Sequence, residues 1–314
     1  SKIRCLAARQ DPDIGLTVEL TNGGKTTWRY EIKFNQEIRG NRLPKITHEA
    51  VFKDGRQLLA RPDKEDERDS LRLTQTALEQ LNFNTEFREL VQAFEKIAYL
   101  HLVPQFIRAS GLSSSGLSED AFGRNFLERL AKTNERTKGA RLSRIREALA
   151  IAVPQLKELS LERDERGAPH LVGAYKHWRP KAAKQNEEQF SDGTLRLLGL
   201  LWSLQEGDGP LLLEEPELSL HSSIIRRLPE LIHRLQRARK RQVFVSTHSL
   251  ELLADEGIGA EEILMLTPSA EGTQVKSAAG VTEIRVLMES GMSAADAVIP
   301  HTEPPQITQL EMFK

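Results

Sequence analysis

Two adjacent carboxylates follow a short apolar segment in the second half of the chain. Leu211–Leu213 is followed directly by Glu214 and Glu215. An apolar strand that ends in acids places them at the carboxyl edge of a sheet, where α/β proteins bind ligands. Glu214 is suited to hold Mg²⁺, directly or through water, and Glu215 to orient or deprotonate an attacking water. A plain strand followed by an acidic turn is the alternative interpretation.

A second apolar segment also ends in polar residues. Val243–Val245 is followed by Ser246, Thr247 and His248. A histidine at this position can contact a γ-phosphate or polarise an attacking water, although an isolated histidine at a strand end is more often structural. Its place one helix after the carboxylate strand favours the functional interpretation.

A third motif precedes a leucine-rich helix. Ser191, Asp192, Gly193 and Thr194 are followed by Leu195 and Arg196 and then by the apolar segment 197–201. A Ser and a Gly at a helix start leave backbone N–H groups unpaired at the positive end of the helix dipole, which suits a phosphate. An ordinary serine N-cap is the alternative.

The order and spacing of these three motifs resemble those of ABC-type ATPase heads. SDGTLR is similar to the ABC signature, LLLEEPELSLH to an extended Walker B motif with its D-loop, and VSTHS to the switch-histidine strand. The residues within these motifs resemble those of the RecF, SMC, Rad50 and OLD group, especially its compact bacterial AAA-labelled ATPases. The resemblance covers about residues 85–270, and the motifs lie within 190–249.

In that family two heads sandwich ATP and Mg²⁺, and each site takes its signature motif from the partner subunit. The resemblance assigns the nucleotide site as follows: Ser191, Asp192, Gly193 and Thr194 in trans, Glu214 to the Mg²⁺ shell, Glu215 to water activation, His248 to the γ-phosphate, and Ser219 to His221 to the D-loop. Glu214 departs from the more common Asp, and its longer side chain can still reach a metal.

A Walker A loop is not found in the sequence. The only candidate is Gly24-Lys25-Thr26, but Glu19 stands where its first glycine should be, and the residues after Thr26 alternate as a strand. We therefore interpret Asn22–Thr26 as a hairpin turn. The Q-loop is not placed either. Two explanations compete: a preceding segment carries Walker A, consistent with the non-Met start, or hydrolysis is lost and the fold serves assembly. We favour the first.

The surrounding elements predict an α/β fold, an ABC-type head with N-terminal antiparallel hairpins, a helical insertion lobe and a mostly parallel core sheet. Alternating residues predict hairpins around 22–24, 54–55 and 164–167. Helical spacing predicts a helix over 90–98 that Pro104 ends, with further helices near 122–130 and 142–152. Later segments predict helices over 193–205 and 222–240 and strands over 211–213, 243–245 and 263–266, in a parallel sheet covered on both faces.

The predicted domains are an ATPase head over 1–60 and 156–300, a helical insertion lobe over 61–155 and a flexible tail over 301–314. Composition agrees with a cytoplasmic globular protein. Among 314 residues, 39% are hydrophobic and 28% charged, and the net charge is −1, so any nucleic-acid contact must come from a local patch. A single cysteine excludes a disulfide framework and a multi-cysteine zinc site. The chain shows no signal-peptide pattern and no membrane-length apolar run.

Two weaker signals concern partners. A basic segment could contact DNA phosphates through Arg226, Arg227, Arg234, Arg237 and Arg241, although a solvated helix face is the simpler interpretation. Near the end of the chain, Gln309, Leu310, Met312 and Phe313 resemble a sliding-clamp docking peptide, with a tail packed on its own head as the alternative.

The sequence thus predicts Mg²⁺-dependent ATP binding and hydrolysis that drives dimer closure. Closure would regulate DNA binding or a separate effector, in DNA repair or anti-phage defence. The alternative is a non-hydrolysing head that acts as a scaffold for a partner nuclease.

Overall fold

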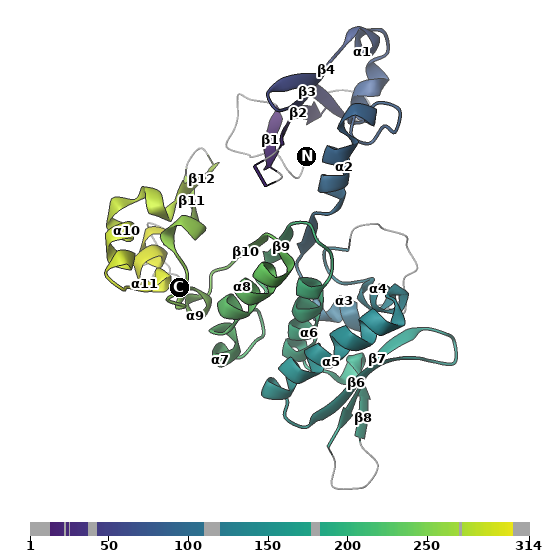
Figure 1. Ribbon diagram of the computed structural model, residues 1–314, viewed down its shortest axis with the longest axis vertical. Helices are drawn as coiled ribbons and strands as arrows, with labels where there is room; N and C mark the ends of the chain where they lie inside the picture. Colours follow the sequence, from purple (N-terminus) through teal and green to yellow (C-terminus); the bar gives the residue numbers. More distant parts are fainter. Residues whose placement is uncertain are drawn as a thin grey trace, which may run out of the picture. The chain divides into compact units, whose positions relative to one another are not determined.

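The computed structural model describes residues 13–21, 23–24, 26–36, 43–109, 120–176, 183–269 and 272–303 (Figure 1). The chain divides into two compact units, Ser1–Glu95 with Leu266–Val275, and Lys96–Met265 with Lys276–Lys314. Leu90 belongs to the same buried cluster as Trp28 and Tyr30 of the N-terminal sheet, so the first unit continues to Glu95. The predicted head and insertion lobe, divided at residue 60, stay a prediction.

The first unit is built on a four-stranded antiparallel sheet in the order β1-β2-β3-β4. Its elements are β1 (Ile14–Thr21), β2 (Thr27–Gln36), β3 (Pro44–Lys53), β4 (Arg56–Arg61), α1 (Lys64–Arg68) and α2 (Arg88–Glu95). Thr21 pairs with Thr27 across the first turn, where Gly23 and Gly24 adopt left-handed φ angles. The hairpin interpretation of this segment is confirmed, and so is the hairpin at Asp54-Gly55.

The second unit contains the parallel core sheet. Its strands are β5 (Ala98–Leu100), β9 (Leu211–Glu214) and β10 (Val243–Ser246), in the order β10-β9-β5. The prediction of a helix through residue 98 was wrong, because these three residues pair with Leu211–Leu213 as a strand. Pro104 does not end a helix but begins one, α3 (Pro104–Arg108), where its missing N–H and fixed φ are tolerated.

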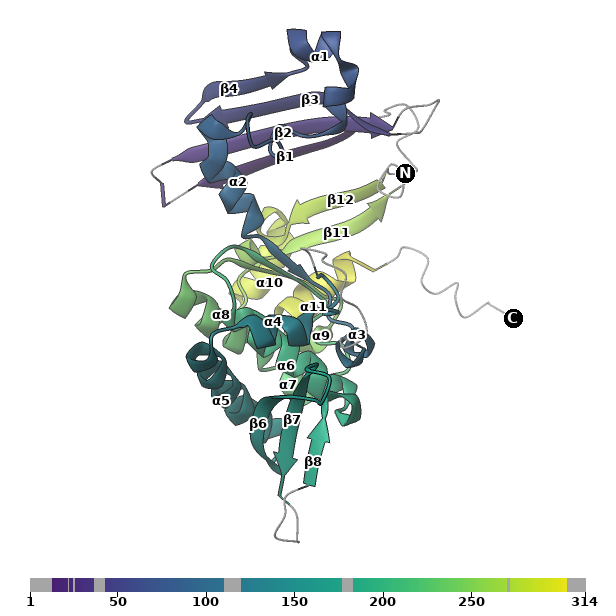
Figure 2. The same cartoon turned by 90° about the vertical axis from the view of Figure 1, so that its right-hand side faces the viewer.

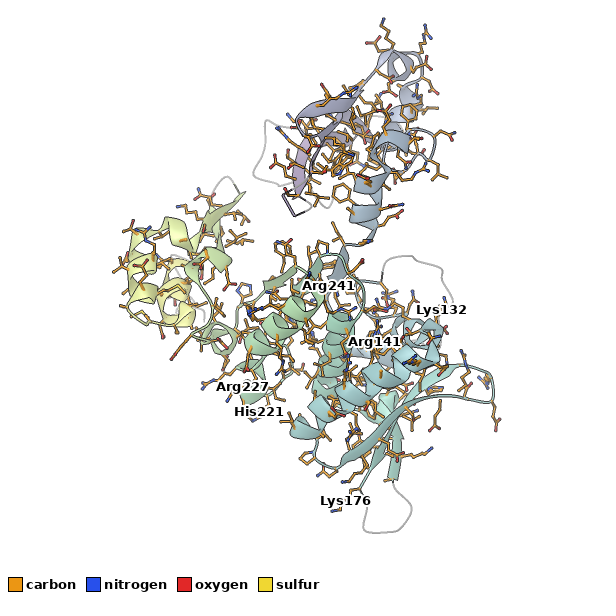
Figure 3. All side chains as sticks on the ribbon, viewed as in Figure 1. Lys132, Arg141, Lys176, His221, Arg227 and Arg241 are labelled. Carbon is orange, nitrogen blue, oxygen red and sulfur yellow. The ribbon has the colours of Figure 1, made fainter. Side chains whose placement is uncertain are left out.

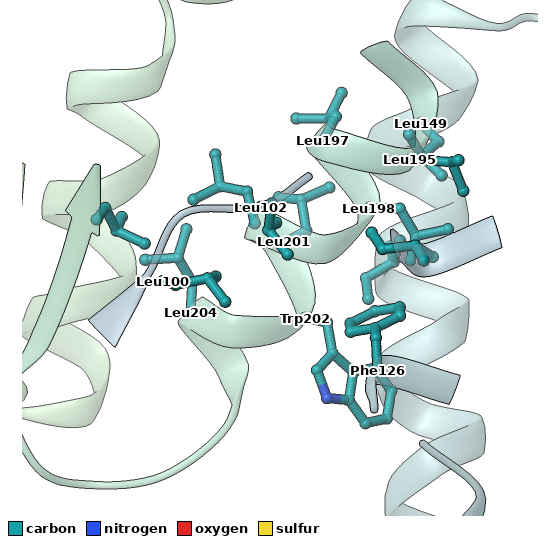
Figure 4. Close-up of a cluster of buried hydrophobic side chains, with 14 of the residues drawn as sticks. Leu100, Leu102, Phe126, Leu149, Leu195, Leu197, Leu198, Leu201, Trp202 and Leu204 are labelled. Carbon is teal, nitrogen blue, oxygen red and sulfur yellow. The ribbon is translucent and has the colours of Figure 1, made fainter. Parts of the chain in front are cut away.

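Helix α6 (Asp192–Gln205) is the central element of this unit. It packs between α5 (Glu135–Ala152) and α8 (Leu228–Arg239), as Figure 1 shows. Every residue from Leu195 to Gln205 is buried, which is why leucines occur on all sides of the helix. Arg196, Ser203 and Gln205 are its buried polar exceptions. In the close-up of this core, the Trp202 ring meets Phe126 edge to face, with the ring centroids 6.4 Å apart (Figure 4).

Only one face of the core sheet is covered by the described residues of this unit. Leu211 and Leu213 face the cluster around α6, whereas Tyr99 and Phe244 on the opposite face are 46% and 47% exposed. The alternation of burial along all three strands gives the same picture. The prediction of a sheet covered on both faces is therefore not met within these residues.

The other elements surround this core. Strands β6 (Leu156–Arg163), β7 (Pro169–Tyr175) and β8 (Ala183–Asn186) form an antiparallel sheet beside α5 (Figure 2). The predicted helix over 222–240 is interrupted, giving α7 (Ser222–Ile225) and α8. Remaining helices are α4 (Phe126–Lys132), α9 (Leu250–Leu253), α10 (Thr282–Glu289) and α11 (Ala294–Val298).

The strand predicted over 263–266 lies outside the core sheet. It is part of β11 (Leu264–Ser269), which pairs with β12 (Gly272–Ser277) in a separate two-stranded sheet. The helices in the described part of the chain include none long and apolar enough to cross a membrane.

Candidate functional site

The predicted catalytic segments meet at the carboxyl edge of the core sheet. Glu214, the last residue of β9, is the register partner of Ser246, the last residue of β10. Because the two strands are parallel, the segments that follow them, with Glu215 and with His248, leave the same edge. The side chain of His248 is exposed there.

Glu215 adopts a backbone conformation that is costly for a side chain of its type. Its φ angle is +42°, and Ser219, at the end of the same turn, has a φ of +62°. The Glu215 N–H donates to the Ser246 carbonyl at 2.9 Å, which fixes this turn to β10. Left-handed residues other than glycine are uncommon and collect at functional sites. The strain thus falls on the residue that the sequence singled out for water activation.

Glu214 has an unexpected partner. The Tyr99 hydroxyl, from the neighbouring strand β5, donates to Glu214 Oε2. This hydrogen bond and the negative charge of Glu214 raise the pKa of Tyr99. The phenol therefore stays a donor and orients the carboxylate. Sequence analysis missed Tyr99, because the strand that carries it is too short to show an alternating pattern.

Glu217 links the two segments behind the site. It is only 6% exposed, and its Oε1 accepts a hydrogen bond from the Thr247 hydroxyl, next to His248. The Thr247 hydroxyl oxygen in turn accepts from the Ser249 N–H at 2.9 Å. The turn after β9 and the turn after β10 are thereby tied together by side chains as well as by the sheet.

The third motif forms the amino terminus of α6. Ser191 is the N-cap: its hydroxyl accepts from the Thr194 N–H at 3.2 Å and lies 2.8 Å from the Thr194 hydroxyl. Asp192 is held by Arg108 at 2.6 Å and by Gln105 at 3.4 Å. The start of this fourteen-residue helix carries partial positive charge suited to a phosphate. Arg108 and Gln105 were not found by sequence analysis.

Gly193 brings this helix against the turn that follows β9. A Cβ atom at position 193 would lie 2.6 Å from the backbone oxygen of Ser219. Only glycine permits this approach. The signature-like and D-loop-like segments of one chain are therefore in direct contact. His221 lies just beyond, where Nδ1 accepts from the Ser223 N–H at 3.2 Å and caps α7.

The predicted DNA-contacting arginines divide into two sets. Arg226, Arg227, Arg234 and Arg237 are exposed. Arg241 is not available to DNA, because it is 5% exposed and donates to the carbonyls of Ser203, Glu206 and Gly209 near the end of α6. Figure 3 shows Arg227 beside His221 at one end of α8 and Arg241 beyond the other end.

The residues proposed for clamp docking, Gln309, Leu310, Met312 and Phe313, lie outside the described residues, as does most of the predicted 301–314 tail.

The oxygen-rich donor set at the sheet edge fits Mg²⁺ with a nucleotide. Magnesium usually takes one or two carboxylates together with substrate phosphates and water rather than a complete protein cage. Glu214 and the Ser246 hydroxyl supply oxygens of that kind. The described residues hold no cluster of three or more His, Cys, Asp or Glu that could form a full protein cage.

The α/β fold carries the strand-end carboxylates, the strand-end histidine and the serine-capped helix start in the arrangement predicted for an ATPase head of the ABC type. Residues 3–254 match the family described as "AAA domain, putative AbiEii toxin, Type IV TA system". The chain belongs to this family of ATPase domains.

Several solved structures are similar to the chain. The SMC head domain from Thermotoga maritima is 11% identical with a TM-score of 0.39, over 85% of this chain and 74% of that one. An Smc head bound to the C-winged helix domain of ScpA is 14% identical with a TM-score of 0.39, over 80% and 73%. A Pyrococcus furiosus Smc head with an extended coiled coil is 14% identical with a TM-score of 0.35, over 80% and 76%. No curated protein matches the sequence.

Proposed function

We propose that this chain is the catalytic head of an ATP hydrolase that closes as a dimer around nucleotide. The observation that carries the proposal is the meeting of Glu214, the strained Glu215 and the His248 segment at one sheet edge. The capped start of α6 lies against the Ser219 end of the same turn. A head of this kind binds one nucleotide with its own strand ends and offers its helix start to the nucleotide of its partner.

Each residue then has a defined task. Glu214, oriented by Tyr99, would hold Mg²⁺, which neutralises charge on the phosphates when it is bound. Glu215 would accept a proton from, or orient, the attacking water, and His248 would contact the γ-phosphate. The hydroxyls of Ser191 and Thr194 and the backbone N–H groups of Asp192 and Gly193 would bind the partner's nucleotide, with Ser219 and His221 at the dimer crossing.

The phosphate-binding loop is part of the same proposal. We infer that a Walker A segment outside the described residues supplies the remaining phosphate contacts. In the described residues β10 pairs with β9 along one edge only, so its other edge can accept a further strand.

The test is ATP hydrolysis by the full-length protein and by Glu215→Gln. We expect the wild type to turn over ATP with Mg²⁺ and the variant to bind ATP, form a dimer and lose turnover by about 100-fold or more. Glu165→Gln, an exposed carboxylate in the β6–β7 turn, is the matched control and should hydrolyse normally. A wild type that neither binds nor hydrolyses ATP would favour the non-hydrolysing scaffold instead.

We further propose that closure controls DNA binding or a separate effector such as a nuclease, in DNA repair or anti-phage defence. The family's description as a putative toxin of a type IV TA system supports an effector role. The exposed Arg226, Arg227, Arg234 and Arg237 support a phosphate-backbone contact, because only Glu230 among the residues of α8 carries opposite charge. Clamp docking through residues 309–313 stays a separate prediction.

A further inference from the structure

Arg196 is a buried cation whose donors are not all used. It lies in the second turn of α6, directly after the phosphate-binding start of the helix, and is 7% exposed. Its Nε and Nη1 atoms have no hydrogen-bond partner among the described residues. A guanidinium offers five N–H donors, and leaving a buried one unpaired is costly. Such a group is expected to gain partners in another state of the protein.

Glu217 is a buried anion that also has an unpaired hydrogen-bonding atom. Its Oε1 accepts from Thr247, but Oε2 has no hydrogen-bond partner among the described residues. Two buried groups of opposite charge, each with an unused hydrogen-bonding atom, therefore lie behind one site. By contrast, the buried charges Arg61 and Asp66 are paired directly at 2.9 Å.

Arg196 lies beside the turn that carries Glu217. Arg196 lines a small pocket with Glu214 and Pro216, at the base of the carboxylate turn. Burial lowers the pKa of Arg196, while the charges of Asp192, Glu215 and Glu217 oppose this effect. Asp192 is already paired with Arg108 and Gln105. Glu215 is only half-buried and Glu217 is buried, so Glu217 Oε2 is the buried acceptor near the guanidinium that has no hydrogen-bond partner among the described residues.

We propose that Arg196 is a positioning residue that closes onto Glu217 when nucleotide engages the start of α6, and thereby sets the placement of Glu215. Ser191 and Arg196 lie on successive turns of one rigid helix, so a displacement at the phosphate contact also moves the guanidinium. Gly193 touches Ser219 at the far end of the turn that begins with Glu215. Through Glu217 and Thr247 the same movement reaches the segment of His248. The inference rests on the proposed ATPase function.

The first experiment compares Arg196→Met and Arg196→Lys in the full-length protein. We expect Arg196→Met to lower kcat by about 100-fold, since a small misplacement of a catalytic group has that effect. The KM for ATP and the ATP-driven dimer should change less than about threefold, because uniform binding is kept. Arg196→Lys should recover part of kcat, and Arg144→Met, an exposed arginine on α5, should leave it unchanged.

Glu217→Gln is the second variant, because it keeps the shape and the Thr247 contact while it removes the charge. It should lower kcat as Arg196→Met does, and the double variant should be little worse than either single one. If Arg196→Met does not fold, Glu217→Gln decides alone. A folded Glu217→Gln protein with normal kcat would overturn the inference.

Mixed dimers show which site Arg196 serves. A chain carrying both Glu215→Gln and Arg196→Met, paired with wild type, should keep about half of the activity, because the wild-type chain retains Glu215 and its own Arg196. Glu215→Gln paired with Arg196→Met should be nearly inactive. The reverse pattern would mean that Arg196 positions groups in the partner's site. That result would overturn the inference and leave the ATPase proposal intact. An inert wild type would overturn both.

Discussion

At the scale of single residues, the site depends on how closely two backbones approach. Gly193 has the Ser219 carbonyl where a side chain would begin, and this contact joins the first turn of α6 to the turn after β9. Glu215 and Ser219 hold left-handed conformations in that same turn. The close approach at Gly193 and the left-handed turn constrain each other, because relaxing the turn would move the Ser219 oxygen away from the helix.

Alanine substitution separates this role from general helix propensity. Gly193→Ala should lower the free energy of unfolding by about 1–3 kcal/mol through overpacking, and abolish ATP turnover. Gly139→Ala is the matched control, because a Cβ there meets no atom within 4 Å and α5 is an ordinary helix. It should raise the free energy of unfolding by about 1 kcal/mol. Urea denaturation of both variants checks the prediction, and equal stabilisation would contradict it.

At the scale of elements, an ion pair fixes the segment that leads into α6. Glu187 is 1% exposed; it accepts from the Leu171 N–H at 2.8 Å and lies 2.8 Å from His170 Nδ1. The hydrogen bond with Glu187 raises the pKa of His170 above its usual 6.5. Strand β7 thus fixes the position of the segment that precedes the Ser191 N-cap.

This pair makes stability depend on pH. A raised folded-state pKa means that the His170 contribution is complete below about 6.5 and is lost as pH rises through the higher folded value. Wild type should therefore exceed His170→Gln in unfolding free energy most at pH 5.5, and the difference should shrink toward pH 8.5. Denaturation midpoints across this range provide the measurement. A difference that grows with pH would show that the sign is wrong.

A second element-scale contact closes the other end of α6. The Arg241 guanidinium donates to the Ser203 carbonyl at 2.8 Å and also to the carbonyls of Glu206 and Gly209. A cation there also opposes the negative end of the helix dipole. Arg241→Met should lower the free energy of unfolding by about 3 kcal/mol, since it leaves buried acceptors unpaired. Arg144→Met should change it little, and equal effects of the two variants in thermal melts would refute this role.

The sequence predicted the parts of the site that lie at the ends of long or strongly patterned elements. Strands β9 and β10 were found because their apolar runs end abruptly in polar residues, and helix α6 because a polar capping motif precedes its leucines. Tyr99 was missed because its partner Glu214 lies far along the chain and strand β5 is too short to show a pattern. The strain at Glu215 left no trace, since no glycine marks it. Arg196 did leave a signal, a lone cation in a leucine-rich helix, but burial was needed to interpret it.

At the scale of the whole molecule, the candidate site and the four exposed arginines proposed to contact DNA belong to one compact unit. This unit spans Lys96–Met265 with Lys276–Lys314. The proposed DNA contact can therefore be coupled to nucleotide state without a second domain. Arg226 and Arg227 stand between α7 and α8, close to the segment proposed to cross the dimer. A closed dimer would present two such surfaces related by its symmetry.

DNA binding has a quantitative signature on this scale. Arg234→Met and Arg237→Met together should weaken binding of duplex DNA equally for all sequences, and should reduce the slope of log affinity against log salt by about 2. Stability should stay at the wild-type value, because both side chains are exposed. Fluorescence anisotropy across a salt series tests this. An unchanged slope would show that the two arginines do not contact DNA phosphates.

The left-handed turn from Glu215 to Ser219 also bears on how such a protein can evolve. Each of the two residues costs about 1–3 kcal/mol relative to a relaxed backbone. A glycine at either position would recover part of that energy, at Glu215 with the loss of the carboxylate. Selection for heat resistance alone should therefore enrich glycine or asparagine at position 215, and yield robust proteins that no longer hydrolyse ATP. Lineages that keep the head only as a scaffold are expected to drift in the same direction.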